Sequence, residues 1–312
     1  MPPGTHAVTL TAQAAREISY ASSAATPSGR AVIRLLENAT GRIGLIRRAR
    51  GYESEMSGGA SFYEVMYRRY GLRLEVTGAL ETIPAEGPVV VVSNHPYGVL
   101  DGLTMAHILC GRRGGDFRIL ANSVFRHVPH LGPNILPVDF EESREAASRN
   151  LASRAEALRY LAGGGAIGVF PGGTVSTAAT PFGPPLDPAW RSFTARMIAR
   201  SGATVVPLFF EGRTSRLFQV ASHLHMTLRL GLLIHEFGRR TDGPVRVVVG
   251  EPIPRGRLDA FGPDSRGMMA FLRRETYALS PRPVPLDALG HEFEERHRRP
   301  EREIPAPAPA HS

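Results

Sequence analysis

Short apolar runs alternate with stretches of helical periodicity through the middle of the chain. The run Val89–Val92 predicts a buried strand, because it is too short for a helix and consists of β-branched residues. Similar runs predict further strands at 72–76, 117–121, 135–139, 166–170, 204–210 and 245–249. Helical spacing predicts helices at 61–71, 102–113, 141–161, 189–201, 224–237 and 264–279. Strands that alternate with helices indicate an α/β fold whose mostly parallel sheet is flanked by helices.

The ends of the chain differ from this central pattern. Residues 1–28 show no clear periodicity, and between Arg30 and Gly51 apolar residues recur at helical spacing among arginines. This second segment predicts two short basic amphipathic helices that break near Thr40 and Gly41. They fit a membrane surface, and they fit equally well a helix pair that covers the core with a solvated arginine face.

The pattern divides the chain into four parts. The tail is rich in proline, arginine and glutamate, so we predict it to be disordered. The predicted parts are a lead-in with amphipathic membrane-surface helices at 1–69, a central α/β domain at 70–255, a C-terminal helix at 256–281 and the tail at 282–312.

Composition removes several classes of enzyme. All 37 basic residues are arginines and the formal charge is +8. Without lysine there is no Schiff-base enzyme, no pyridoxal-phosphate enzyme and no P-loop nucleotidase. The positive charge favours an anionic partner, either a nucleic acid or the headgroups of a membrane.

Cys110 is the sole cysteine, which excludes an intrachain disulfide and a zinc cluster built on thiolates. A reducing, cytoplasmic compartment fits this. The N-terminus has no apolar block of secretory length, and no run approaches the ~18 to 20 apolar residues of a spanning helix. We therefore expect a protein that lies on a membrane if it meets one.

The most informative segment runs from Ser93 to Gly102. It leaves a predicted strand, turns through Pro96 and Gly98, and begins a helix near Asp101. His95 and Asp101 are therefore expected at the carboxyl edge of the sheet, where ligands bind in open α/β folds. A histidine can take a proton from a hydroxyl while a carboxylate fixes its tautomer. The alternative is that Asp101 only caps the helix and His95 is an ordinary turn residue.

Four blocks in order resemble the 1-acylglycerol-3-phosphate acyltransferase family. Asn94-His95 with Asp101 resembles its His-x4-Asp block, here with five intervening residues. The second, third and fourth blocks are Ile135 to Phe140, Phe170 to Ser176 (FPGGTVS against FPEGTRS) and Val205 to Pro207. The wider texture is most similar to the bacterial hemolysin-type branch, which includes acyltransferases implicated in ornithine-lipid synthesis.

Three departures from the family pattern concern the acceptor. Gly172 stands where the family has glutamate, and Val175 and Phe140 stand where it has arginines. Those arginines are thought to grip the acceptor phosphate, and neither valine nor phenylalanine replaces a guanidinium fork. These substitutions favour an acceptor without a glycerol phosphate.

The resemblance implies an O-acyltransferase of membrane lipid synthesis with His95 and Asp101 as catalytic residues. The implied cosubstrate is acyl-CoA or acyl-carrier protein, and the acceptor is lysophosphatidic acid or a lyso-ornithine-type lipid. We expect no bound cofactor, no metal, no nucleic-acid partner, and a peripheral position on an anionic membrane at the cytoplasmic face of the inner membrane. The predicted substrate-binding residues are Asn94, Pro171, Gly172, Gly173, Thr174 and Arg213.

The sequence also allows two other functions. A lipid ester or thioester hydrolase could use His95 on water, and a membrane-binding protein would use neither motif residue. Arg213 and Arg216 could hold an anionic group or form a solvated turn. The glycines at 163–168 match the letters of a dinucleotide fingerprint, but they follow a helix and precede a strand, the reverse of the required order.

Overall fold

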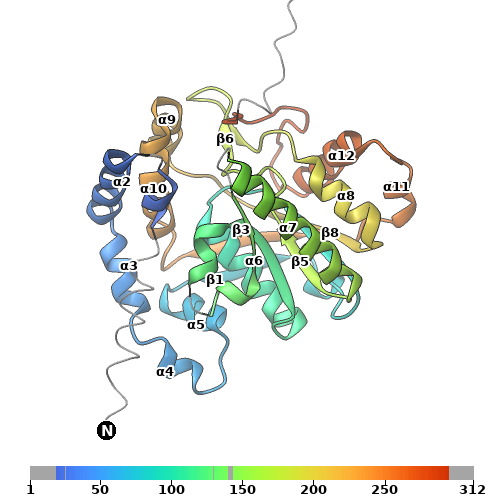
Figure 1. Cartoon of the computed structure of the whole chain (residues 1–312), viewed down its shortest axis with the longest axis horizontal. Helices are drawn as coiled ribbons and strands as arrows, with labels where there is room; N and C mark the ends of the chain where they lie inside the picture. Colours follow the sequence, from blue (N-terminus) through green and yellow to red (C-terminus); the bar gives the residue numbers. More distant parts are fainter. Residues whose placement is uncertain (1–18, 25, 129, 140–142, 295–312) are drawn as a thin grey trace, which may run out of the picture.

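The computed structural model describes residues 19–24, 26–128, 130–139 and 143–294, and a seven-stranded sheet forms its centre (Figure 1). The strand order is β1-β9-β8-β2-β5-β3-β4. All neighbouring strands are parallel except β8 and β9. The predicted α/β fold with a mostly parallel sheet is therefore confirmed. The strands are β1 (Arg73–Thr77), β2 (Val89–Ser93), β3 (Phe117–Asn122), β4 (Ile135–Val138), β5 (Ala166–Val169), β8 (Thr204–Phe210) and β9 (Pro244–Val249).

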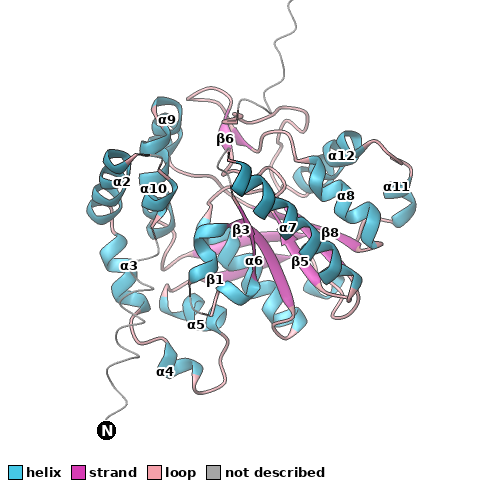
Figure 2. Ribbon diagram, in the orientation of Figure 1, coloured by secondary structure: helices cyan, strands magenta, loops and turns pink. Residues whose placement is uncertain are grey.

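Helices cover both faces of this sheet (Figure 2). Alternate residues of β2 point to opposite faces, so Val89 and Val91 join one apolar cluster while Val90 and Val92 join another. The first cluster is completed by α5 (Phe62–Arg69) and α6 (Val99–Arg113). The second cluster is completed by α7 (Arg144–Ala162), α8 (Ser192–Ser201) and α12 (Ser265–Ala278), and the short α11 (Arg255–Asp259) lies beside them.

A further helical layer lies at one side of the sheet (Figure 1). It contains α2 (Pro27–Ala39), α3 (Arg42–Ala49), α9 (Arg216–Leu224) and α10 (Met226–Gly238), and α4 (Glu53–Met56) follows it. The predicted pair of N-terminal helices and its break at Thr40 and Gly41 are confirmed. The predicted helix at 224–237 is confirmed as α10, whereas α9 was not predicted, because its buried face carries Gln219 and Ser222 beside Phe218 and Ala221.

The C-terminal boundary predicted at 282 is too early. Residues 282–294 pack against the body of the protein, because Arg273 donates to the carbonyls of Leu286 at 2.8 Å and Ala288 at 2.6 Å. The rest of the predicted tail, 295–312, lies outside the described residues, as does the lead-in at 1–18. No helix of the described part is both long and apolar enough to span a bilayer.

Candidate active site

The turn that carries His95 joins β2 to α6. It needs a glycine at position 98, whose backbone has φ +79° and where a Cβ atom would lie 3.1 Å from a methyl carbon of Val175. The helix begins at Val99, so Asp101 lies in its first turn. Asp101 is therefore not the N-cap residue that the alternative interpretation of the sequence predicts. Because Asp101 points back toward the turn, it faces the residues that precede the helix.

Asp101 reaches His95 and the backbone of the turn through the same oxygen. Its Oδ2 lies 3.0 Å from His95 Nδ1 and accepts the N–H groups of Tyr97 at 2.7 Å and Gly98 at 3.0 Å. The ring N–H is not aligned for a good hydrogen bond, which is common in catalytic pairs before substrate binds. Asp101 thus stabilises the helix start and also contacts the histidine.

Burial makes Asp101 an unusual carboxyl group. The side chain is completely inaccessible, and this burial raises its pKa, while the contact with His95 and the backbone N–H groups oppose the rise. An ionised carboxylate in such a place favours a positive charge on the neighbouring imidazole. The pair can therefore accept a proton at His95 during a reaction.

Besides Asp101, the His95 ring lies next to the Phe170 ring and a cavity. The ring stacks on Phe170 with centroids 4.2 Å apart, and the residue lines a large cavity. Because Nδ1 faces Asp101, Nε2 is the nitrogen left to meet a substrate hydroxyl.

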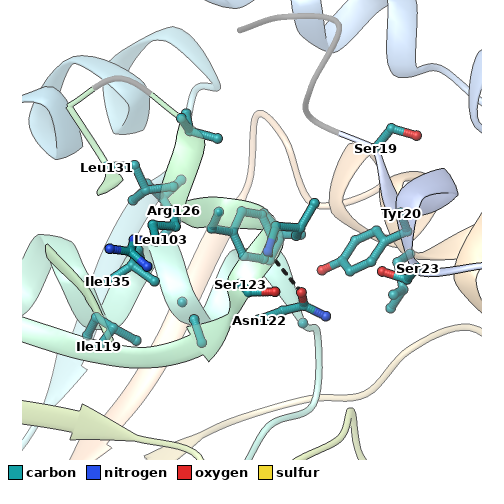
Figure 3. A pocket seen from close by; sticks show the side chains of 18 of the residues that line it. Ser19, Tyr20, Ser23, Leu103, Ile119, Asn122, Ser123, Arg126, Leu131 and Ile135 are labelled. Carbon is teal, nitrogen blue, oxygen red and sulfur yellow. Dashed lines mark hydrogen bonds between the residues drawn. The ribbon is translucent and has the colours of Figure 1, made fainter. Parts of the chain in front are cut away.

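This cavity has a volume of about 2000 Å³ and a largely apolar wall. Figure 3 shows part of it, with Tyr20 and Ser23 on one side and Leu131 and Ile135 on the other. Pockets for compact ligands measure roughly 300 to 1,000 Å³, so this space is large enough for chain-like molecules.

The turn after β5 forms the second wall beside His95. It reaches the same sheet edge because β5 pairs with β2 in parallel, and the Ser176 N–H donates to the His95 carbonyl at 2.8 Å. Of the predicted substrate-binding residues in this turn, Gly173 and Thr174 line the cavity, whereas Pro171 and Gly172 are buried. The Gly173 N–H already donates to the Phe170 carbonyl at 3.0 Å.

Two other predicted binding residues do not line the cavity. Asn94 is buried and exchanges two hydrogen bonds with the backbone of Phe210, at 2.9 and 2.7 Å, so its role is to fasten β2 to β8. Arg213 is exposed on the loop before α9, and Arg216 donates to the carbonyls of Phe182 and Gly183. Phe140, the third departure from the family pattern, lies outside the described residues.

Asp187 is a site residue that the sequence did not reveal. It is completely buried, and its carboxylate accepts hydrogen bonds from the His95 N–H at 3.3 Å, the Trp190 indole at 2.9 Å and the Ser176 hydroxyl. A Cβ atom at Gly172 would lie 3.3 Å from the Asp187 carboxyl carbon. Asp187 therefore holds the two turns together from a segment that matches no motif.

Two arginines that sequence reasoning missed flank the turn after β5. Arg229 of α10 is buried and donates to the Thr174 hydroxyl and the Val175 carbonyl, both at 2.9 Å. Burial lowers its pKa to about 9. Arg191, at the start of α8, lines the cavity and pairs with Glu292. Neither arginine is close to this turn in the sequence, so no local motif indicated them.

The family is settled by a model described as "Acyltransferase", which matches residues 53–287. The chain belongs to this acyltransferase family. Two relatives, each a lyso-glycine lipid O-acyltransferase, align over 213 residues and 66% of the chain. The one from Phocaeicola vulgatus is 28% identical over 74% of its length, and the one from Bacteroides thetaiotaomicron is 26% identical over 75%.

A solved structure is also similar to this acyltransferase. It is the 1-acyl-sn-glycerophosphate (LPA) acyltransferase PlsC from Thermotoga maritima, with 18% sequence identity and a TM-score of 0.44. The match covers 70% of this chain and 75% of that one.

Proposed function

We propose that this acyltransferase moves a fatty acyl group from the thioester of acyl-carrier protein or coenzyme A to the hydroxyl of a lyso-lipid. The observation that carries the proposal is the His95 and Asp101 pair, 3.0 Å apart, with the histidine on the wall of a cavity of about 2000 Å³. Such a cavity has room for the chains of both substrates.

In this mechanism His95 Nε2 takes the proton of the acceptor hydroxyl as its oxygen attacks the thioester carbonyl. Asp101 orients the ring and stabilises the imidazolium that forms. Among the backbone amides of the Gly172-Gly173-Thr174 turn, that of Thr174 is the best placed to receive the tetrahedral oxyanion, because Thr174 lines the cavity and the Gly173 amide already donates to Phe170. The C–S bond then breaks, and the imidazolium returns its proton to the thiolate.

The acceptor that we propose is an acyl amino-acid lyso-lipid. Both relatives are named for a lyso-glycine lipid, and Val175 provides no guanidinium at the position of the family's arginine. Losing charge-assisted hydrogen bonds of about 1.5 to 3 kcal/mol each should weaken a grip on lysophosphatidic acid.

The test is a competition between acceptors. Purified enzyme receives one acyl donor with equal amounts of lysophosphatidic acid and a lyso-glycine or lyso-ornithine lipid, and products are counted by mass spectrometry. We expect the amino-acid lipid to be acylated preferentially. Preference for lysophosphatidic acid would contradict the proposed acceptor, and fatty acid released without acceptor would indicate a hydrolase.

We also propose that the layer of α2, α3, α9 and α10 rests on an anionic membrane surface. Large apolar side chains of this layer are exposed to solvent, namely Val32, Leu35, Ile43, Leu217, Leu224 and Met226. The exposed arginines Arg30 and Arg47 lie on the same helices. An apolar stripe flanked by arginines is typical of helices that lie in the headgroup region.

A matched pair of leucines tests this orientation. Leu35 of α2 is 69% exposed and Leu151 of α7 is 67% exposed. We expect Leu35→Glu to lower binding to vesicles of anionic phospholipid in a flotation assay, whereas Leu151→Glu should leave it unchanged. Equal effects of the two substitutions would contradict the orientation.

A further inference from the structure

A carboxylate is already bound at the edge of the cavity. The guanidinium of Arg191 holds the Glu292 carboxylate with two hydrogen bonds, at 2.6 and 3.0 Å, and lies 3.5 Å from Glu294. The side chains of Arg191 and Glu292 are only 20% and 13% exposed, and both line the cavity that contains His95. Two parallel N–H···O bonds are the geometry by which arginine recognises a carboxylate.

Arg191 lies directly at the turn after β5. Its backbone N–H donates to the Pro171 carbonyl at 2.8 Å, and its Nε would be 3.6 Å from a Cβ atom on Gly173. Phe170, the residue before this turn, stacks on the His95 ring. A carboxylate on Arg191 is therefore bound beside the loop that packs on the proposed base.

The chain that delivers Glu292 is fixed just before it. The N–H of Gly290 donates to the Asp187 carbonyl and that of His291 to the Thr177 carbonyl, both at 2.9 Å. Beyond Glu292, the Phe293 ring lies 4.2 Å from the guanidinium carbon of Arg229. Residues 292–294 thus place an acidic group and an apolar ring in the cavity, which is the chemistry of an acyl amino acid.

Arg229 is less suited to bind a carboxylate from a ligand. Its Nη1 donates to the hydroxyls of Thr177 and Ser222. Its Nη2 donates to the Thr174 hydroxyl and the Val175 carbonyl. Its guanidinium is thus occupied in holding the loop, whereas the fork of Arg191 holds a carboxylate.

We propose that Arg191 binds the carboxylate of the acceptor headgroup and that Glu292 fills this site until an acceptor displaces it. The inference rests on the proposed function, since it gives that acceptor its recognition residue. One fork matches one carboxylate, so the ligand class is an N-acyl amino acid with a free carboxyl group and a hydroxyl on its acyl chain.

The test compares N-(β-hydroxypalmitoyl)glycine with its methyl ester. The ester keeps the chain and the hydroxyl but has no negative charge. Turnover and binding are both measured, for the parent and for Arg191→Met, Arg191→Lys and Glu292→Gln. Arg200→Met is the matched control, because Arg200 is an exposed arginine of the same helix.

We expect Arg191→Met to lower kcat/KM and affinity for the free acid by ~10- to 100-fold, the worth of a charged hydrogen-bonded pair. The loss should appear in KM, and the methyl ester should change less than threefold. Arg191→Lys should lie between the two. Glu292→Gln should lower the KM for the acid by about three- to tenfold, because more molecules then have an open site.

Several results would overturn the assignment. Equal losses for acid and ester in Arg191→Met would make Arg191 a structural residue. A Glu292→Gln variant that loses activity as Arg191→Met does would show that the ion pair only fastens the C-terminal segment. If the protein binds the acid through Arg191 but transfers no acyl group, this carboxylate site is supported and the proposed function is contradicted.

Discussion

Two turns meet at the carboxyl edge of the sheet, and they are built in different ways. The turn after β2 contains its own chemistry, because His95 and the Asp101 that contacts it lie six residues apart. The turn after β5 has lost the side chains that the related motif carries, and residues from distant segments surround it. In the proposed mechanism, proton transfer is therefore encoded locally, while acceptor recognition is assembled from the whole fold.

At two positions of the turn after β5 where the family's charged side chain is missing, a group of the same charge lies close by from a distant segment. Gly172 stands where glutamate is expected, and the Asp187 carboxylate lies within 3.3 Å of where its side chain would begin. Val175 stands where arginine is expected, and the guanidinium of Arg229 donates to the Val175 carbonyl. A carboxylate and a guanidinium are thus present at the turn, although neither belongs to it in sequence.

The largest expected effect is at His95. We expect His95→Ala to lower acyl transfer by ~10²- to 10⁴-fold with the fold intact, since His95 is the proposed general base. Turnover is measured with acyl donor and lyso-lipid, and folding is checked by circular dichroism. A folded variant with activity within a few-fold of the parent would contradict a catalytic role for His95 and the turn after β2.

Asp101→Asn comes next, with an expected loss of about 10²-fold in kcat and a smaller change in KM. Its proposed role is to orient His95 and to stabilise a charge that exists only in the transition state. Thermal melting should change little at neutral pH, because burial raises the pKa of Asp101 and the ionised carboxylate is costly there. A sharp fall in melting temperature with unchanged kcat would reduce Asp101 to a helix-stabilising residue.

That raised pKa also fixes a sign for the dependence of stability on pH. A carboxyl group whose pKa is higher in the folded state stabilises the fold most at low pH, and this contribution is lost as the pH rises from the unfolded toward the folded pKa. The parent should therefore lose stability relative to Asp101→Asn across that interval. Urea unfolding of both proteins at several pH values measures the difference, and an opposite slope would contradict it.

Restoring the family's glutamate at position 172, in the turn after β5, should destabilise the protein. Gly172→Glu would put a second carboxylate against Asp187 in a buried place, and we expect a loss of about 2 kcal/mol in the free energy of unfolding, within the range for overpacking. Adding Asp187→Asn should recover part of the loss by removing the like charge. A Gly172→Glu variant as stable as the parent would show that Asp187 does not occupy the glutamate's place.

The smallest expected effect is at Arg229. Arg229→Met leaves several oxygens of the second turn without donors, so we expect about a tenfold fall in kcat/KM from a less ordered turn. Arg216→Met, on an exposed arginine of α9, is the control. If both variants keep full activity, the turn does not depend on its distant guanidinium.

Periodicity was sufficient for most of the fold. The strand at 204–210 and the break between the first two helices were predicted to the residue, because β-branched runs and Gly41 are strong local signals. The polar face of α9 and the packed segment 282–294 were not predicted. In both, the stabilising contacts are hydrogen bonds to residues far away in the chain, such as those of Gln219 to the 176–178 backbone.

The sequence by itself determined the strands, the helices between them, and the closeness of His95 and Asp101, because each of these depends on neighbours within about ten residues. Only the tertiary structure decided that Asn94 fastens two strands, that Arg213 lies away from the cavity, and that Asp187, Arg191 and Arg229 surround the second turn. Hydrogen bonds and ion pairs of buried polar groups require a partner at about 3 Å, whatever its distance along the chain. Local sequence patterns do not identify partners that are distant along the chain, so these contacts could be recognised only from the tertiary structure.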